Sequence, residues 1–164
     1  MRHLWAPWRM EYIKEGYQGS ECLFCTLMAM EDNPENLILH RGEHAFVVLN
    51  RYPYTNGHMM VVPCDHQPSL GGLDQNTLHE MIELVQRGLD VLVTAYSADG
   101  FNVGSNIGAA AGAGVEEHVH MHLVPRWLGD TNFMATTANT RVIPESLEET
   151  YTLLQDIWSK SEQA

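Results

Sequence analysis

The feature that most constrains this chain is the stretch EEHVHMHLVPRW at residues 116–127, in which three histidines stand at every second position. In a helix, two residues turn by about 200°, so the middle histidine would point away from the outer two. In a strand, alternate side chains share one face. The residues between the histidines are apolar and suit a buried opposite face. Residues 117–126 are therefore predicted to form a strand with one face made of His118, His120 and His122.

Hydrophobic periodicity predicts the remaining elements. Apolar residues recur at spacings of three and four over residues 74–96, which indicates a long amphipathic helix. The other expected elements are a hairpin at 36–50, strands at 57–63 and 100–108, and a C-terminal helix at about 145–159. Strands and helices do not alternate regularly. The predicted fold class is therefore α+β, with a mainly antiparallel sheet of about five strands.

Length and composition predict one domain. The 164 residues contain no repeat and no low-complexity linker, so residues 1–164 are taken as a single unit with a core at about 22–130. An aromatic segment, HLWAPWRMEYI, lies within residues 1–20 and is expected to plug the sheet or contact a dimer partner. No apolar stretch is long enough for a membrane span, and the N-terminus lacks the continuous apolar segment of a signal peptide. A cytoplasmic protein is expected.

The net charge of −12 argues against binding to nucleic-acid polymers or anionic membranes, because the long-range field repels polyanions. A small anionic ligand held by local donors remains possible. The glycine-rich loop GAAAGAG at residues 108–114 precedes the histidines. Glycine lets bare backbone N–H groups approach an anion, so this loop suggests a phosphate.

Three readings of the histidines compete. Alternate histidines on a strand can bind a catalytic metal, but Glu116, Glu117 and Asp130 stand at no recognised ligand spacing. Histidine is scarce, so three on one merely exposed face are improbable. Nucleophilic or acid/base chemistry is the favoured reading.

Four stretches together resemble one known family over about residues 36–130: HVHMHLV, VPRWLGD, VVLNRYPYTNGHMMVVP and SNIGAAAGAGVEEH. They resemble the histidine triad (HIT) superfamily, and within it the Fhit-like branch. The start, LWAPWRMEYI, is similar to bacterial members that include diadenosine tetraphosphate phosphorylases. The resemblance implies a homodimeric enzyme that cleaves dinucleoside polyphosphates, such as diadenosine tetra- or triphosphate, at an α-phosphate. Its partner would be a purine nucleotide, and Mg²⁺ is expected to accompany the substrate.

The resemblance also implies catalytic roles. His120 would attack the phosphorus and form a covalent nucleotidyl-histidine, while His122 would contact the scissile oxygen and the leaving group. His58 and backbone N–H groups of the loop would neutralise developing charge. His118 would orient the others or bind a metal.

Six residues match nucleotide-binding positions of the family. Val48 would line the base pocket, Asn50 would bond ribose hydroxyls and Asn106 would touch phosphate. The loop residues are Gly112, Ala113 and Gly114. Related hydrolases carry Gln just before the triad, and related phosphorylases a small hydroxyl residue. Here Ala113 and Gly114 leave the second acceptor, water or inorganic phosphate, open.

Cys22 and Cys25 form a C-x-x-C pair without the strand–C-x-x-C–helix setting of a redox motif. In bacterial relatives such a pair binds structural zinc together with two histidines, which match His66 and His118. The alternative is two reduced thiols in a core, with His118 serving only in hydrogen bonding. Cys64 is expected to be a small buried residue. The remaining histidines, His3, His40, His44 and His79, are expected at the surface.

The other functions weighed are a nucleoside phosphoramidase, a general nucleotidyl hydrolase, a metallohydrolase and a non-catalytic purine-nucleotide-binding signalling module.

Overall fold

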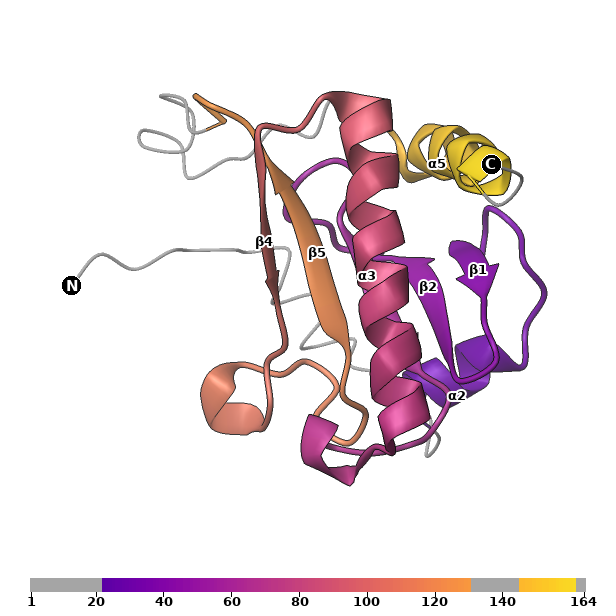
Figure 1. Cartoon of the computed structure of the whole chain (residues 1–164), viewed down its shortest axis with the longest axis vertical. Helices are drawn as coiled ribbons and strands as arrows, with labels where there is room; N and C mark the ends of the chain where they lie inside the picture. The colour runs from indigo at the N-terminus through magenta and orange to yellow at the C-terminus, as the bar shows by residue number, and fades with distance from the viewer. Residues whose placement is uncertain (1–21, 131–144, 162–164) are drawn as a thin grey trace.

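The computed structural model describes residues 22–130 and 145–161 (Figure 1). The aromatic segment predicted at residues 1–20 lies outside the described residues. The described elements are, in chain order, α2 (Leu23–Met28), β1 (Ile38–Arg41), β2 (Ala45–Leu49), β3 (Met59–Pro63), η1 (Leu70–Gly72), α3 (Gln75–Tyr96), β4 (Gly100–Gly104), η2 (Ala109–Ala111), β5 (Met121–Arg126) and α5 (Leu147–Ser161).

The five strands form one sheet in the order β1-β2-β3-β5-β4, and every neighbouring pair is antiparallel. The predicted α+β class and hairpin are thereby confirmed. All residues of β2 and β3 are buried. β5 joins this buried centre to the edge strand β4. The strand that carries the end of the histidine stretch therefore lies inside the sheet.

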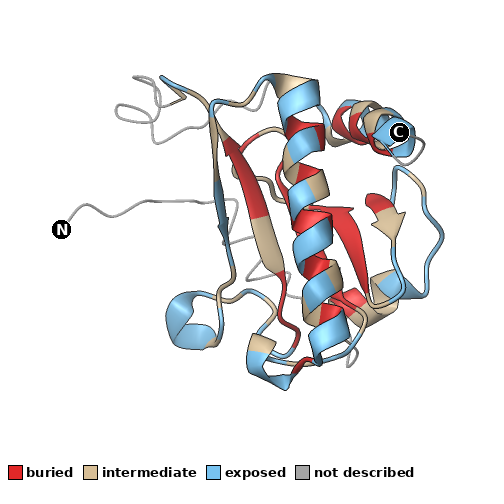
Figure 2. Ribbon diagram, viewed as in Figure 1, coloured by how far each residue is buried: buried red, intermediate tan, exposed pale blue. Residues whose placement is uncertain are grey.

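Helix α3 covers one face of the sheet, and its buried side faces the strands while its outer side is exposed (Figures 1 and 2). Asp74 caps its start, because the side chain accepts a hydrogen bond from the Thr77 N–H. Gly88 allows close packing, since a Cβ there would lie 2.8 Å from Leu123 and 3.0 Å from Met59. Helix α5 packs beside α3 and against β1. Helix α3 therefore supports β3 and β5, and α5 supports β1.

The predicted histidine strand at 117–126 is too long. β5 begins at Met121, and the pairing of β3 with β5 starts at the same residue. Before it, the Val119 N–H donates to the Gln67 carbonyl at 2.7 Å and not to a ladder partner. His118 and His120 therefore lie on an irregular segment, and only His122 lies in the strand.

Other boundaries also shift. The strand predicted at 100–108 ends at Gly104, and the C-terminal helix runs two residues beyond its predicted end, to Ser161. His40 is not a plain surface residue: it is partly buried, with its ring 5.4 Å from that of Trp158. No helix of the described residues is long and apolar enough to span a bilayer.

Candidate active site and metal centre

A pocket of about 430 Å³ lies beside the histidine segment. Most of the predicted nucleotide-binding residues line this pocket. They come from β2, from the residue that follows it, from the segment after β4 and from the glycine-rich loop. Those that line it are Val48, Asn50, Asn106, Gly112 and Gly114. His120 and His122 line the same pocket. Segments far apart in the sequence thus meet at one cavity.

The loop offers fewer N–H groups than predicted. The Gly112 N–H donates to the Ala109 carbonyl at 2.9 Å, and the Ala113 N–H to the Gly108 carbonyl at 3.4 Å. Ala113 does not line the pocket. Among the described residues, the Gly114 N–H has no hydrogen bond, so of the three predicted donors at Gly112–Gly114 it is the one left for an anion.

His120 presents a bare ring nitrogen to the pocket. Its Nδ1 lies 2.9 Å from the His118 carbonyl oxygen, which can only accept, so Nδ1 carries the proton. Nε2 then holds a lone pair. Burial lowers the pKa of His120, and the bond to the carbonyl opposes this only in part. The imidazole is consequently neutral at pH 7, as a nucleophile must be.

His58 and His122 form a hydrogen-bonded pair. In both neutral rings the proton is on Nε2, which is the opposite tautomer to that of His120. The Tyr54 N–H donates to His58 Nδ1 at 3.1 Å, so the proton of His58 is on Nε2. That Nε2 lies 3.0 Å from His122 Nδ1 and donates to it. In a neutral His122 the proton is therefore on Nε2. The ring centroids of His120 and His122 lie 4.8 Å apart. The unprotonated Nε2 of His120 and the Nε2–H donor of His122 therefore belong to rings that line the same pocket.

His58 lies behind His122 and does not line the pocket. It is buried, and burial together with the neighbouring His122 and His120 lowers its pKa to about 3. It stays neutral at working pH. Its geometry suits holding His122 in place, whereas the sequence predicted that it neutralises charge on the substrate.

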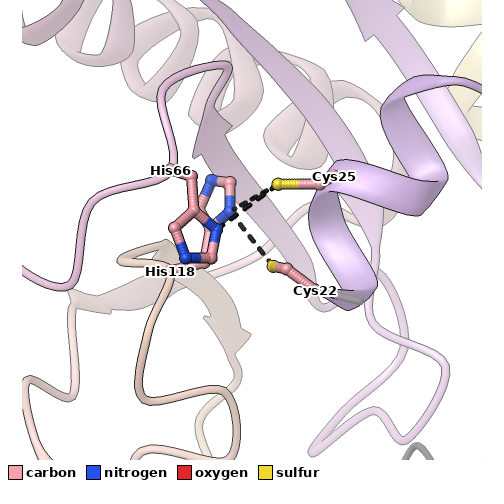
Figure 3. A group of neighbouring side chains, drawn as sticks. All are labelled: Cys22, Cys25, His66 and His118. Carbon is pink, nitrogen blue, oxygen red and sulfur yellow. Dashed lines mark hydrogen bonds between the residues drawn. The ribbon is translucent and has the colours of Figure 1, made fainter. Parts of the chain in front are cut away.

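The predicted metal ligands come together at the other side of the histidine segment. Cys22 and Cys25 project from α2 toward His66 and His118, and the four ligand atoms lie within 4.8 Å of one another (Figure 3). His118 Nε2 donates to the Pro63 carbonyl at 2.9 Å, which leaves Nδ1 bare. The carbonyl therefore aims a lone pair of His118 into the cluster.

The spacing of this cluster fits a tetrahedral ion. The Sγ–Nδ1 distances are 3.3 Å for Cys22–His118, 3.4 Å for Cys25–His66 and 3.7 Å for Cys25–His118. A tetrahedron with zinc–ligand bonds of ~2.0–2.3 Å has edges of roughly 3.3–3.8 Å. Two thiols and two imidazoles also form a donor set that zinc prefers. The cluster can hold a metal ion.

Helix α2 supplies pocket residues that sequence analysis missed. Leu23, Phe24 and Leu27 line the same pocket as His120 and His122. Tyr54, also missed, lines it too, and its ring stacks on His58 with centroids 4.7 Å apart. The sequence carried one signal for the α2 residues. Leu23, Phe24 and Leu27 stand between and after the two cysteines, at spacings that put them on one side of a helix.

The family model for the HIT domain matches residues 31–127. The chain belongs to the histidine triad (HIT) family. This HIT protein is 35% identical to the AP-4-A phosphorylase of Mycobacterium tuberculosis over 167 residues, covering 98% of this chain and 86% of that protein. The predicted membership and the predicted similarity to bacterial diadenosine tetraphosphate phosphorylases are confirmed.

Two solved structures share the fold. A Zn-bound histidine triad family protein from Mycobacterium smegmatis is 26% identical, with a TM-score of 0.70 over 87% of this chain and 96% of that one. A hypothetical histidine triad nucleotide-binding protein from Sulfolobus tokodaii is 30% identical, with a TM-score of 0.66 over 87% of this chain and 92% of that one.

Proposed function

We propose that this HIT protein cleaves dinucleoside polyphosphates, diadenosine tetra- or triphosphate, at an α-phosphate through a nucleotidyl-His120 intermediate. The observation that carries the proposal is the bare Nε2 of His120 beside the Nε2–H of His122 in one pocket. Similarity to an AP-4-A phosphorylase over 98% of the chain supports the substrate class.

In the first step, the lone pair of His120 Nε2 attacks the α-phosphorus, and the bond to the bridging oxygen breaks. The leaving polyphosphate takes the electron pair of that bond and accepts a hydrogen bond from His122 Nε2–H, which stabilises its charge. The nucleotidylated His120 ring becomes cationic, and the His118 carbonyl stabilises it through Nδ1. For diadenosine tetraphosphate the products are adenylyl-His120 and ATP.

In the second step, the oxygen of the acceptor attacks phosphorus and returns the electron pair to His120 Nε2, while the proton that the acceptor releases passes to solvent. Water gives AMP, and inorganic phosphate gives ADP. The similarity to a phosphorylase supports phosphate, and the absence of a long side chain at Ala113 and Gly114 leaves room for it. Product analysis with and without phosphate distinguishes the two acceptors.

Nucleotide contacts follow from the residues that line the pocket. Val48 would pack on the base. Asn50 Oδ1 already accepts the Tyr52 N–H at 2.9 Å, which leaves its amide N–H group to donate to ribose. Asn106 and the Gly114 N–H would face phosphate.

Cys22, Cys25, His66 and His118 would hold structural zinc. Four protein ligands fill a tetrahedral ion, so its contribution would be a cross-link between α2 and the histidine segment. The Zn-bound relative supports the choice of metal. The homodimer, the cytoplasmic location and Mg²⁺ on the substrate stay predictions.

The decisive experiment is His120→Ala, with exposed His79→Ala as the matched control. We expect His120→Ala to reduce turnover of diadenosine tetraphosphate on the order of 10⁴-fold or more, because loss of a nucleophile removes the covalent route. AMP affinity should stay within about threefold, since a small side chain is lost from a large pocket. Near-normal turnover by His120→Ala would show that the nucleophile is wrongly assigned.

Intact-mass spectrometry of the wild-type protein with substrate should detect an adenylyl adduct that His120→Ala lacks. A non-catalytic binding module would form no adduct. Faster cleavage of adenosine phosphoramidates than of diadenosine polyphosphates would instead indicate a phosphoramidase.

A further inference from the structure

We propose that α2 forms one wall of the nucleotide pocket. It is held in place by the Cys22–Cys25–His66–His118 cluster at its start and by Arg41 at its end. Metal loading would then set nucleotide affinity through α2. The inference rests on the proposed function in one respect, that the ligand of the pocket is a nucleotide.

The helix has two functional faces. Leu23, Phe24 and Leu27 line the pocket, whereas Cys22 and Cys25 belong to the metal cluster. One residue turns a helix by about 100°, so positions 23, 24 and 27 share a side that positions 22 and 25 do not. The same short element therefore connects the cluster to the pocket.

Helix α2 has little stability of its own. It contains six residues, and no side chain caps its N-terminus. Isolated helices shorter than ~12–15 residues are marginal in water. Its conformation and position must come from tertiary contacts, and the Cys/His cluster and Arg41 supply polar ones at its two ends.

At the C-terminal end of α2, Arg41 of β1 donates hydrogen bonds to backbone carbonyls that have no partner within the helix. Its Nη1 donates to the Met28 carbonyl at 2.7 Å, and Nη2 donates to the Met30 carbonyl at 2.5 Å. Its Nε donates to Asp32 at 2.6 Å, which fixes the guanidinium. Met30 also lines the pocket, so this contact lies at the pocket edge.

Phe24 links α2 to the proposed nucleophile, because its ring packs against that of His120. It is only 2% exposed, and its ring centroid lies 4.8 Å from that of His120 and 5.4 Å from that of His118. If α2 moved away, the pocket would lose an apolar wall and His120 would lose a packing partner. The apparent Kd rises as the fraction of docked helix falls, so docking about a tenth of the time weakens binding about tenfold.

The first test compares Cys25→Ser with Cys64→Ser, a thiol outside the cluster. Three quantities are measured on the full chain: bound zinc by elemental analysis, AMP affinity by calorimetry, and hydrogen exchange of residues 23–28. For Cys25→Ser we expect loss of zinc, AMP binding weaker by about tenfold, and faster exchange in α2 with α3 unchanged. Cys64→Ser should match the wild type in all three.

Wild-type protein stripped with a chelator should behave like Cys25→Ser and recover on addition of zinc sulfate, which keeps the test valid if the variant does not fold. Metal-free protein with wild-type AMP affinity and α2 exchange overturns the proposal. Wild-type protein that binds no AMP in its zinc-loaded form also overturns it.

The second test separates the effect of the position of α2 on AMP binding from the effect of bound metal. Arg41→Ala should keep zinc but weaken AMP binding several-fold, because the free helix end leaves its site part of the time. Lys160→Ala removes the same charge from an exposed pair on α5 and should change neither. Unchanged AMP affinity in Arg41→Ala overturns the wall model. None of these outcomes depends on turnover, so failure of the cleavage proposal would be seen separately, as wild-type protein that binds AMP but forms no adduct.

Discussion

At the scale of single residues, backbone groups make His120 and His122 chemically different. The His118 carbonyl accepts a hydrogen bond from Nδ1–H of His120, so Nε2 of that ring holds the lone pair that the proposed attack needs. The Tyr54 N–H acts through His58 and leaves the proton of His122 on Nε2, so that ring is a donor. A carbonyl and an amide thus give the two imidazoles opposite tautomers, one with a lone pair on Nε2 and one with an N–H there.

The lowered pKa of His120 predicts the pH dependence of the first step. The nucleophile acts only when neutral, and burial moves its pKa below the ordinary 6.5. The rate of adenylylation should therefore hold down to pH 6.5 and fall only at lower pH, as His120 becomes protonated. Single-turnover measurements across the acid range check this. An acid limb centred above pH 6.5 would contradict it.

His58 predicts a loss of stability in acid. Its folded-state pKa of about 3 lies below the ordinary 6.5, so below pH 6.5 the unfolded chain binds the extra proton. The stability that neutral His58 contributes is full above pH 6.5 and declines toward pH 3, by at most about 1.4 kcal/mol per pH unit. Urea unfolding at several pH values should show a shallower decline for His58→Gln than for His79→Ala. Equal slopes would contradict the assignment.

At the scale of elements, the turn before β3 sets the position of His58. Gly57 has φ of +75°, and a Cβ there would lie 2.7 Å from Leu92 and 2.9 Å from Tyr96 of α3. Only glycine allows this turn to press against the helix. The turn before β3 and helix α3 are therefore packed as one unit.

Gly57→Ala should destabilise the protein by about 2–5 kcal/mol, because a left-handed conformation costs about 1–2 kcal/mol and overpacking about 1–3 kcal/mol. Gly71→Ala is the control, since its Cβ would meet only Ser69 at 3.8 Å, and its effect should be within ~0.5 kcal/mol. Chemical unfolding measures both. A near-neutral Gly57→Ala would mean that the turn and α3 separate at little cost.

At the scale of the whole molecule, a net charge of −12 opposes an anionic substrate. Raising ionic strength from ~0.01 to ~0.15 M shortens the screening length from about 30 Å to about 8 Å. The association rate of diadenosine tetraphosphate should consequently rise with salt over this range, whereas that of uncharged adenosine should not change. Stopped-flow binding measures both. A rate that falls with salt would indicate steering by local positive charge around the pocket.

The sequence predicted much of this fold because its strongest signals are local. Period-two alternation located β5, and spacings of three and four located α3. Local signals did not show that the strand begins only at Met121, because that depends on where β3 ends its pairing. They also did not reveal the contacts of Phe24 with His118 and His120, because these residues are distant in the sequence and meet only in the folded chain.

By itself, the sequence determined the set of chemical groups and the family, since residue types and their spacing are properties of the chain alone. The tertiary structure alone decided which groups each histidine meets. His118 is 96 residues from Cys22, yet its Nδ1 lies 3.3 Å from the Cys22 Sγ; His58 is 64 residues from His122, yet their ring nitrogens lie 3.0 Å apart. The protonated nitrogen and the pKa of an imidazole depend on its hydrogen-bond partners and its burial, and both arise only when distant segments pack together.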